Sequence, residues 1–115
     1  MQYMLMIYGS ESARQAASKA DNEQMFAAYG AYTRALREAG VMKAGDPLQP
    51  SSTATTVRVK GGKTEVLNGP YAETKEQLGG YYIIEAPDLD AALAWAARCP
   101  GASHGTVEVR PIMAM

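Results

Sequence analysis

The side chains able to move a proton are few in this 115-residue chain, and they are well separated in sequence. His104 is the only histidine, and histidine is the side chain whose ordinary pKa lies closest to neutral pH. A carboxylate such as Asp46 or Glu108 would orient His104 as a general base. In the alternative, His104 only caps the start of the last strand, and Asp46, which precedes a proline, belongs to an ordinary turn.

The stretch LNGPYAETKEQLGGYYIIE, at 67–85, combines turn-forming residues with charged ones before it becomes a strand. Its Asn-Gly-Pro run at 68–70 predicts a tight turn. In one interpretation the segment forms the lip of a pocket, where Glu73 and Lys75 hold or polarise a ligand and Tyr71 packs on it. In another it simply joins two strands and its charges are solvated. A contact with a partner protein is the third interpretation.

Further candidates lie on predicted strands and at a helix end. Arg110 is suited to bind a carboxylate substrate through its planar guanidinium, although an ion pair with Glu108, on the same strand face, would also occupy it. Tyr82 is a candidate hydrogen-bond donor to a ligand, while packing alone accounts for Tyr81 and Tyr82 equally well. Cys99 precedes a proline at a helix end, and we expect an inert buried thiol.

Several classes of function have no basis in the composition. One histidine, one cysteine and scattered carboxylates do not make the ligand spacing that zinc needs. A net charge of -1 argues against nucleic-acid binding, which usually needs a clustered basic face. No signal peptide is recognisable, and no apolar stretch approaches the ~18 residues that span a bilayer. We therefore expect a cytoplasmic protein without cofactor or metal, and with neither nucleic acid nor membrane as a partner.

The first half of the chain predicts a strand and a helix. QYMLMIY, at 2–8, is apolar at nearly every position, which is typical of a strand covered on both faces. A loop or loose helical turn is expected at 10–20. A helix at 21–39 then has Asp21 as its N-cap and ends at Gly40. Its buried stripe is Met25, Tyr29, Tyr32 and Leu36, with Arg34, Arg37 and Glu38 pointing elsewhere, and close packing onto a neighbour would explain Gly30.

The second half predicts a hairpin, two strands and a second helix. A short apolar stretch at 41–45 runs into a proline-containing segment, AGDPLQPSS, which favours a loop over a strand. Two β-rich runs, at 55–60 and 63–67, flank a Gly-Gly pair and indicate a hairpin. Strands are also expected at 80–85 and 106–113. Between those strands, a helix capped by Asp88 buries Leu89, Leu93 and Ala96.

The order of these elements, with the hairpin set aside, is βαββαβ. This is the ferredoxin-like α+β arrangement, in which two helices cover one face of an antiparallel sheet, and the length fits one domain at 1–115. The other sheet face is predicted to carry Met4, Met6 and Tyr8 with a polar margin that includes His104 and Glu108. A mostly apolar face needs a cover, and the simplest cover is a second copy in a symmetric homodimer.

The sequence resembles the YCII-related family, in particular its DGPF-domain branch. The resemblance is carried by GPYAETKEQLGGYYIIEAPDLDAALAWAARCP and HGTVEVRPI, with the opening MQYMLMIYG and LQPSSTATTVRV, so it covers essentially the whole chain. The signature departs from the name of the branch, because Asn-Gly-Pro-Tyr stands at 68–71 where Asp-Gly-Pro-Phe is typical. Asn68 therefore replaces a carboxylate by an amide, and Tyr71 adds a hydroxyl to the ring.

The resemblance implies a dimeric ferredoxin-like α+β barrel. It also implies small-molecule chemistry on ring compounds, of the dehydrochlorinase or lactone type, or a role beside an extracytoplasmic-function sigma factor. The His and Asp often proposed as catalytic in the family do not carry over, because this chain has no N-terminal histidine.

Two functional hypotheses result. The first is a cofactor-independent enzyme or binder for a compact acidic or aromatic ring compound, with proton transfer by His104 and either Asp46 or Glu73, and with Arg110 stabilising charge. Its binding residues would be Arg110, Tyr71, Lys75 and Tyr82. The alternative is a regulatory or interaction module, for example one that binds a sigma-factor-related protein.

Overall fold

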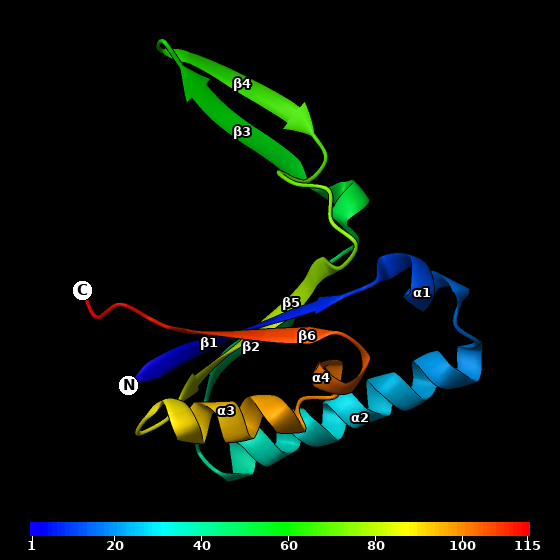
Figure 1. The fold of residues 1–115 in the computed structure, drawn as a ribbon, viewed down its shortest axis with the longest axis vertical. Coiled ribbons are helices and arrows are strands. Elements are labelled where there is room, and N and C mark those ends of the chain that lie inside the picture. The colour runs from blue at the N-terminus through cyan, green and yellow to red at the C-terminus, as the bar shows by residue number, and fades with distance from the viewer.

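The computed structural model describes all residues, 1–115, and contains a four-stranded antiparallel sheet, helices packed on one of its faces and a separate hairpin (Figure 1). The strands of the sheet lie in the order β2-β5-β1-β6. This order and the βαββαβ succession confirm the ferredoxin-like α+β fold. The elements are β1 (Gln2–Gly9), α1 (Glu11–Ala16), α2 (Lys19–Glu38), β2 (Met42–Pro47), η1 (Ser51–Thr53), β3 (Thr55–Lys60), β4 (Lys63–Asn68), β5 (Gln77–Glu85), α3 (Leu89–Arg98), α4 (Gly101–His104) and β6 (Thr106–Pro111).

Side-chain caps set where the helices begin. Asp88 accepts a hydrogen bond from the backbone of Ala91 at 2.9 Å, which confirms it as the N-cap of α3. The predicted cap of α2 was wrong, since Ser18 caps that helix by accepting from the backbone of Asp21 at 3.1 Å. Ser10 caps α1 in the same way, so of the two alternatives expected at 10–20, a loop or a helical turn, the helical one is correct over most of the segment.

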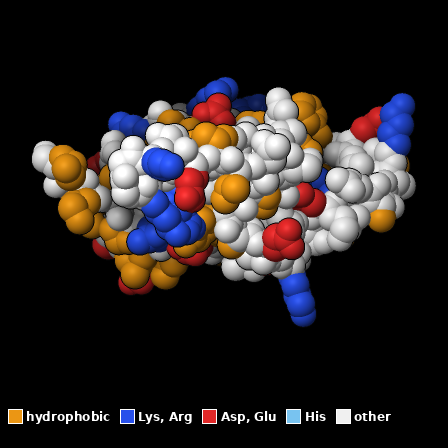
Figure 2. Space-filling view, turned by 90° about the horizontal axis from the view of Figure 1, so that it is seen from above, with side chains coloured by type: hydrophobic (Ala, Val, Ile, Leu, Met, Phe, Trp, Pro, Cys, Tyr) orange, Lys and Arg blue, Asp and Glu red, His pale blue; other side chains and the backbone are white.

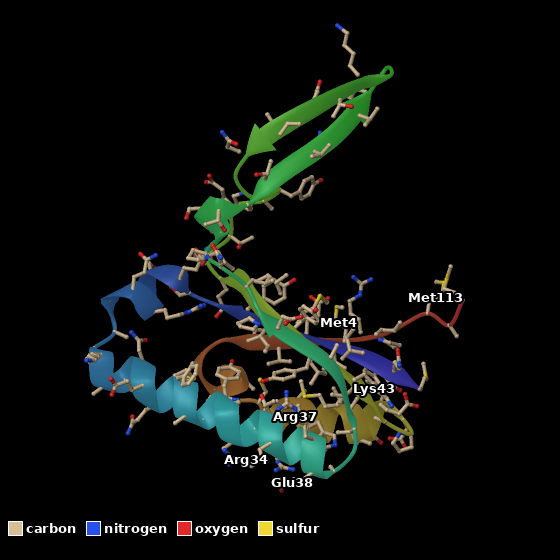
Figure 3. The ribbon with its side chains drawn as sticks, turned by 180° about the vertical axis from the view of Figure 1, so that it is seen from behind. Met4, Arg34, Arg37, Glu38, Lys43 and Met113 are labelled. Atoms are coloured by element: carbon tan, nitrogen blue, oxygen red, sulfur yellow. The ribbon has the colours of Figure 1, made fainter.

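The core lies between the sheet and the helices α2 and α3. Leu5 of β1, Leu36 of α2 and Ile84 of β5 are fully buried there. The rings of Tyr32 and Tyr82 meet edge to face with their centroids 5.4 Å apart, an arrangement that aromatic quadrupoles favour. The apolar stripe predicted for α2 is thus confirmed at its two innermost positions. Arg34, Arg37 and Glu38 lie exposed on α2, as expected (Figure 3).

The buried stripe of α3 matches the prediction at Ala96 and differs from it at the two leucines. Ala92 and Ala96 are buried, whereas Leu89 and Leu93 are exposed to almost half their surface. The helix therefore turns its small side chains inward. The expected close packing at Gly30 is also wrong, because no atom lies within 4 Å of the position that a Cβ would take.

The strand β2 extends into the segment that the prolines had indicated as a loop. Asp46 pairs with Tyr81 and Pro47 with Gly80. Proline is tolerated here because β2 is an edge strand, where a missing N–H breaks no inner ladder. Gly80 allows the close pairing, since a Cβ at that position would lie 3.0 Å from the carbonyl oxygen of Asp46.

The hairpin of β3 and β4 was correctly predicted around Gly61 and Gly62, which both have positive φ. It forms a sheet of its own and projects from the body on the side away from α2 and α3 (Figure 1). The last strand starts at Thr106 and ends at Pro111, and His104 belongs to the short helix α4 before it. The expected alternation of β6 therefore does not extend to His104. None of the helices is both long and apolar enough to span a membrane.

Two leucines of the helices provide a test of the packing. We expect Leu36→Ala to lower the free energy of unfolding by about 2–5 kcal/mol, because it opens a cavity in a fully buried site. Leu93→Ala should cost less than about 1 kcal/mol, since this leucine lies on the outer face of α3. Urea unfolding followed by circular dichroism measures both. Equal losses for the two variants would contradict the observed orientation of α3.

Candidate functional site

The sheet face opposite the helices, here called the open face, has an apolar centre and charged edges. One cross-strand row runs from Asp46 on β2 through Tyr81 and Met6 to Glu108 on β6. The next row ends at Arg110 of β6, which pairs with Met4. Since neighbouring strands lie about 4.8 Å apart, Asp46 and Glu108 are about 14 Å apart across the face. Figure 2, seen from the hairpin side, shows charged side chains among hydrophobic ones.

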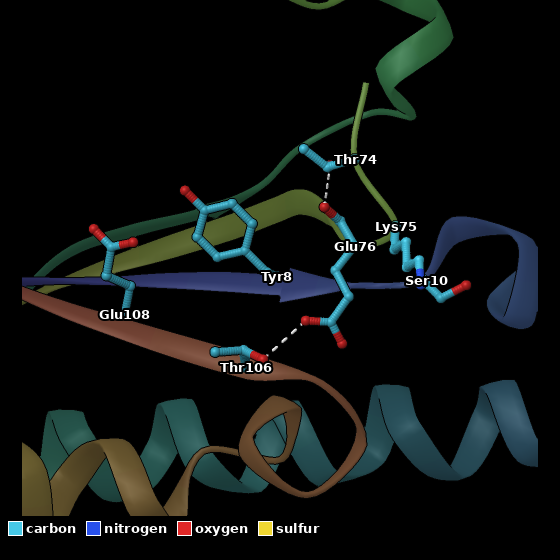
Figure 4. Close-up of a pocket in the computed structure, with 7 residues that line it drawn as sticks. All are labelled: Tyr8, Ser10, Thr74, Lys75, Glu76, Thr106 and Glu108. Atoms are coloured by element: carbon cyan, nitrogen blue, oxygen red, sulfur yellow. Dashed lines mark hydrogen bonds between the residues drawn. The ribbon is translucent and has the colours of Figure 1, made fainter. Parts of the chain in front are cut away.

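A shallow depression of about 750 Å³, open to solvent, lies at one end of the open face, beside β1 and β6 (Figure 4). Tyr8 is its single hydrophobic lining residue, and in the close-up the ring lies between Glu108 and Glu76. Its wall comes from the loop between β4 and β5. The lining residues are Tyr8, Ser10, Thr74, Lys75, Glu76, Thr106 and Glu108.

Hydrogen bonds attach this loop to the sheet. Thr106 donates to the carboxylate of Glu76 at 2.8 Å, which joins the loop to β6. Thr74 donates to the backbone carbonyl of Glu76, and the side-chain amide of Gln77 donates to the carbonyl of Thr74. The wall of the depression is therefore held by side chains at the start of β5 and β6.

A second set of hydrogen bonds holds the connection that leads into the hairpin. The carboxylate of Glu11 accepts from the backbone N–H of Ser51 at 2.8 Å and from its hydroxyl at 2.9 Å. The backbone N–H of Glu11 donates to Gln77 at 3.0 Å. Because bonds to a charged acceptor are stronger than neutral ones, Glu11 ties α1, the start of η1 and the start of β5 together.

Tyr81 and Asp46 form the polar pair at the other edge of the open face. The Tyr81 hydroxyl donates to Oδ2 of Asp46 at 2.8 Å. This hydrogen bond, together with the negative charge of the carboxylate, raises the pKa of the Tyr81 phenol. The phenol thus keeps its proton over a wider pH range than a free tyrosine does.

The predicted site residues are distributed over several parts of the fold. Asp46 and Arg110 lie on opposite edges of the open face, and Lys75 lines the depression. Arg110 approaches Glu108 to 3.9 Å, so the ion pair considered in the sequence forms. Tyr82 faces the helices instead, and its hydroxyl shares a 2.7 Å hydrogen bond with Thr33.

The other predicted residues do not line the depression. His104 is exposed at the end of α4. Glu73 and Tyr71 are exposed in the loop after β4, and the Arg58 guanidinium lies 5.7 Å from the centre of the Tyr71 ring. The structure therefore does not bring His104 or Glu73 together with Lys75 at this site.

Sequence reasoning missed Glu76 and Thr106 as lining residues, and gave Tyr8 no role beyond a place on the sheet face. Alternation along β1 was the signal for Tyr8, because it places this ring on the same face as Met4 and Met6. The approach of Glu76 to Thr106 has no such signal, since the two are 30 residues apart in the chain.

The thiol and several phenols are buried on the helix side. Cys99 is a free, buried cysteine, and burial raises the pKa of its thiol. Burial likewise raises the pKa of the Tyr29, Tyr32 and Tyr82 phenols. These groups stay protonated at neutral pH. The Tyr32 hydroxyl donates a hydrogen bond to the backbone carbonyl of Trp95 at 2.7 Å. Their side chains pack in or against the hydrophobic core.

Comparison with known proteins shows the family of this chain. The family model for the YCII-related domain matches residues 1–115. The chain belongs to the YCII-related family. A curated protein of Rhizobium meliloti (strain 1021), whose name describes it only as uncharacterized, is 40% identical over 114 residues, covering 97% of this chain and 92% of that protein.

A solved structure shares the fold. It is 5-chloro-2-hydroxyhydroquinone dehydrochlorinase from Burkholderia phenoliruptrix AC1100, in complex with 2,5-dihydroxybenzoquinone. The TM-score is 0.56 at 18% sequence identity, with 98% of this chain and 94% of the other covered. The YCII-related α+β fold is therefore common to both proteins.

The Tyr81–Asp46 pair predicts a measurable titration. In Asp46→Asn the acceptor loses its charge, so the pKa of Tyr81 should fall towards the ordinary phenol value of about 10. NMR of protein labelled at tyrosine Cζ measures this, with the Tyr81 signal assigned by Tyr81→Phe.

The titration of Tyr81 has an expected pH dependence, and a distant aspartate serves as its control. Because the pKa of Tyr81 is raised in the folded state, the stabilisation from its hydrogen bond to Asp46 is fully present below the ordinary phenol pKa. This stabilisation is lost as the pH rises through the raised pKa. Asp88→Asn removes the same charge at the start of α3 and should leave the Tyr81 titration unchanged. An unaltered Tyr81 pKa in Asp46→Asn would refute the pairing.

Proposed function

We propose that this protein binds, and acts without a cofactor on, a compact ring compound bearing acidic hydroxyl or carboxylate groups, in the depression on the open face. The observation that supports this most directly is the lining itself. A single aromatic ring, that of Tyr8, lies among an ammonium group and two carboxylates, those of Lys75, Glu76 and Glu108. Small-ligand sites combine an apolar surface with a few polar groups in this way.

The lining groups suit a hydroxylated ring. The Tyr8 ring offers an aromatic face for stacking. Carboxylates accept protons from ring hydroxyls, and the ammonium of Lys75 attracts the phenolate or carboxylate of the ligand. In this proposal Lys75 favours the ionised group of the ligand, while the carboxylates accept hydrogen bonds from its remaining hydroxyl groups.

The proposed chemistry is a proton transfer. A carboxylate of the depression, Glu76 or Glu108, takes the hydroxyl proton of the ring compound, and Lys75 stabilises the resulting anion. Arg110, beside Glu108, adds positive charge at that edge. His104 and Glu73 take no part in this proposed step, because neither lines the depression.

The structural relative supports the substrate class by analogy only. That enzyme is a dehydrochlorinase of a chlorinated hydroxyhydroquinone, and the ligand bound in its structure is a dihydroxybenzoquinone. Both are compact rings with acidic hydroxyl groups. At 18% identity the shared feature is the fold, so the same compound class is a proposal for this chain.

We further propose that the working form is a homodimer. The open face carries Met4, Met6 and Ile83 without cover in the single chain. A second open face laid on the first would shield these side chains and exclude water from the depression. The alternative, a regulatory module that binds a sigma-factor-related protein, gains no support from the relatives found.

A binding experiment tests the proposal. In a thermal-shift assay with millimolar 2,5-dihydroxybenzoquinone, hydroquinones and hydroxybenzoates, at least one compound should raise the melting temperature, because a ligand of the folded state stabilises it. Lys75→Gln should weaken the binding of that compound about tenfold or more, as expected for a lost charge-assisted contact.

The matched control is Lys60→Gln, which removes the same charge at the tip of the hairpin and should leave affinity unchanged. His104→Gln should also bind like the wild type. A ligand whose affinity depends on His104 and not on Lys75 would overturn the proposed site. No stabilisation by any of the three compound classes would count against the proposed substrate.

A further inference from the structure

One face of the β3–β4 hairpin carries three valines that are mostly exposed to solvent. Val57 and Val66 are cross-strand partners, and Val59 lies two residues further along the same face. Their exposed fractions are 61%, 60% and 64%. These three residues are called the valine face. On the reverse side, Arg58 pairs with Glu65 and Lys60 with Lys63, so the hairpin is amphipathic.

The hairpin also lacks support from the body of the chain. Its strands pair with each other and with no strand of the four-stranded sheet. Every residue of β4 is exposed. A two-stranded hairpin is marginally stable at best in water, and solvated valines add nothing to hold it. A single fixed orientation of this hairpin therefore needs a surface outside the chain.

The dimensions of the chain show how much surface is left to cover. The accessible surface is 8049 Å², whereas a compact monomer of this mass, 12.3 kDa, is expected to expose about 6,100 Å². The radius of gyration is 16.0 Å, against about 13 Å for a compact domain of this length. The excess of about 1,900 Å² exceeds the roughly 800 Å² that each partner contributes to a standard interface.

We propose that the hairpin is a dimerisation arm, whose valine face packs against a second copy of this chain, and that this contact completes the depression. The inference rests on the homodimer of the proposed function and adds its main contact. The arm stands on the same side of the sheet as the open face (Figure 1). A second copy seated there meets both surfaces at once.

The lengths of the elements favour a second copy. Packed sheets lie about 10 Å apart, while six-residue strands reach about 20 Å. An arm that rises from one open face therefore extends past the sheet of the partner and contacts its flank. Two-fold symmetry forms this contact twice, because each copy contributes one arm and one flank.

The arm is joined directly to the wall of the depression. Gly69 donates its N–H to the carbonyl of Ala54 at 2.7 Å, and its own carbonyl accepts from Thr56 at 2.8 Å. These bonds close the base of the arm. The next residues of the chain lead to Lys75 and Glu76, which line the depression. A docked arm thus anchors one end of the wall, and an undocked arm leaves it free.

The test uses two neighbouring residues on opposite faces of the arm. Val66 and Leu67 have similar exposed fractions, 60% and 56%, and Val66→Lys and Leu67→Lys make the same change in charge. Sedimentation equilibrium should show a wild-type dimer at micromolar concentration. Val66→Lys should raise the dimer dissociation constant at least tenfold, and Val57→Lys/Val66→Lys still further. Leu67→Lys should change the constant less than twofold.

Hydrogen exchange separates loss of docking from loss of folding. In Val66→Lys the amides of Gly69 and of residues 71–76 should exchange at least tenfold faster than in the wild type, while those of β1 and β5 stay protected. A wild-type monomer at micromolar concentration would overturn the proposal. So would a dimer that Val66→Lys leaves intact, or one weakened equally by both single variants. These readouts need no ligand, so their outcome is independent of the proposed substrate.

Discussion

The helices α2 and α3 cover one face of the four-stranded sheet, and no element of the chain covers the other. Hydrophobic burial is therefore divided between a closed layer, where Leu5, Leu36 and Ile84 pack, and an open layer centred on Met4 and Met6. An apolar sheet face left in water forgoes the stabilisation that burial supplies. The open face and the depression at its end follow from this one-sided packing.

A small set of hydrogen bonds connects these surfaces. The carboxylate of Glu11 holds the segment that leads into the hairpin, and its backbone N–H reaches Gln77 at the start of β5. Gln77 in turn bonds to the loop that carries Lys75 and Glu76. Thus the segment that leads into the hairpin and the loop that carries the lining side chains are joined at the same junction.

The predicted ferredoxin-like order was correct because it depends on periodicity and turn chemistry, which are local. The hairpin around Gly61 and Gly62 and the cap Asp88 are examples. Local signals failed where neighbours decide. Leu89 and Leu93 have helical spacing like that of a core stripe, yet α3 is oriented with Ala92 and Ala96 inward. Strand β2 continues to Pro47 only because it forms an edge.

The sequence by itself determined the fold class, the hairpin and the apolar character of β1, because these are encoded in spacing along the chain. Its longer motifs carried the resemblance to the YCII-related family. Only the tertiary structure decided which polar residues meet. It brought Glu76 to Thr106 and Asp46 to Tyr81, turned Tyr82 towards the helices and left His104 in α4. Contacts across the sheet depend on strand register and on the face that each side chain takes. A one-residue shift in register moves every side chain of a strand to the opposite face and changes its neighbours.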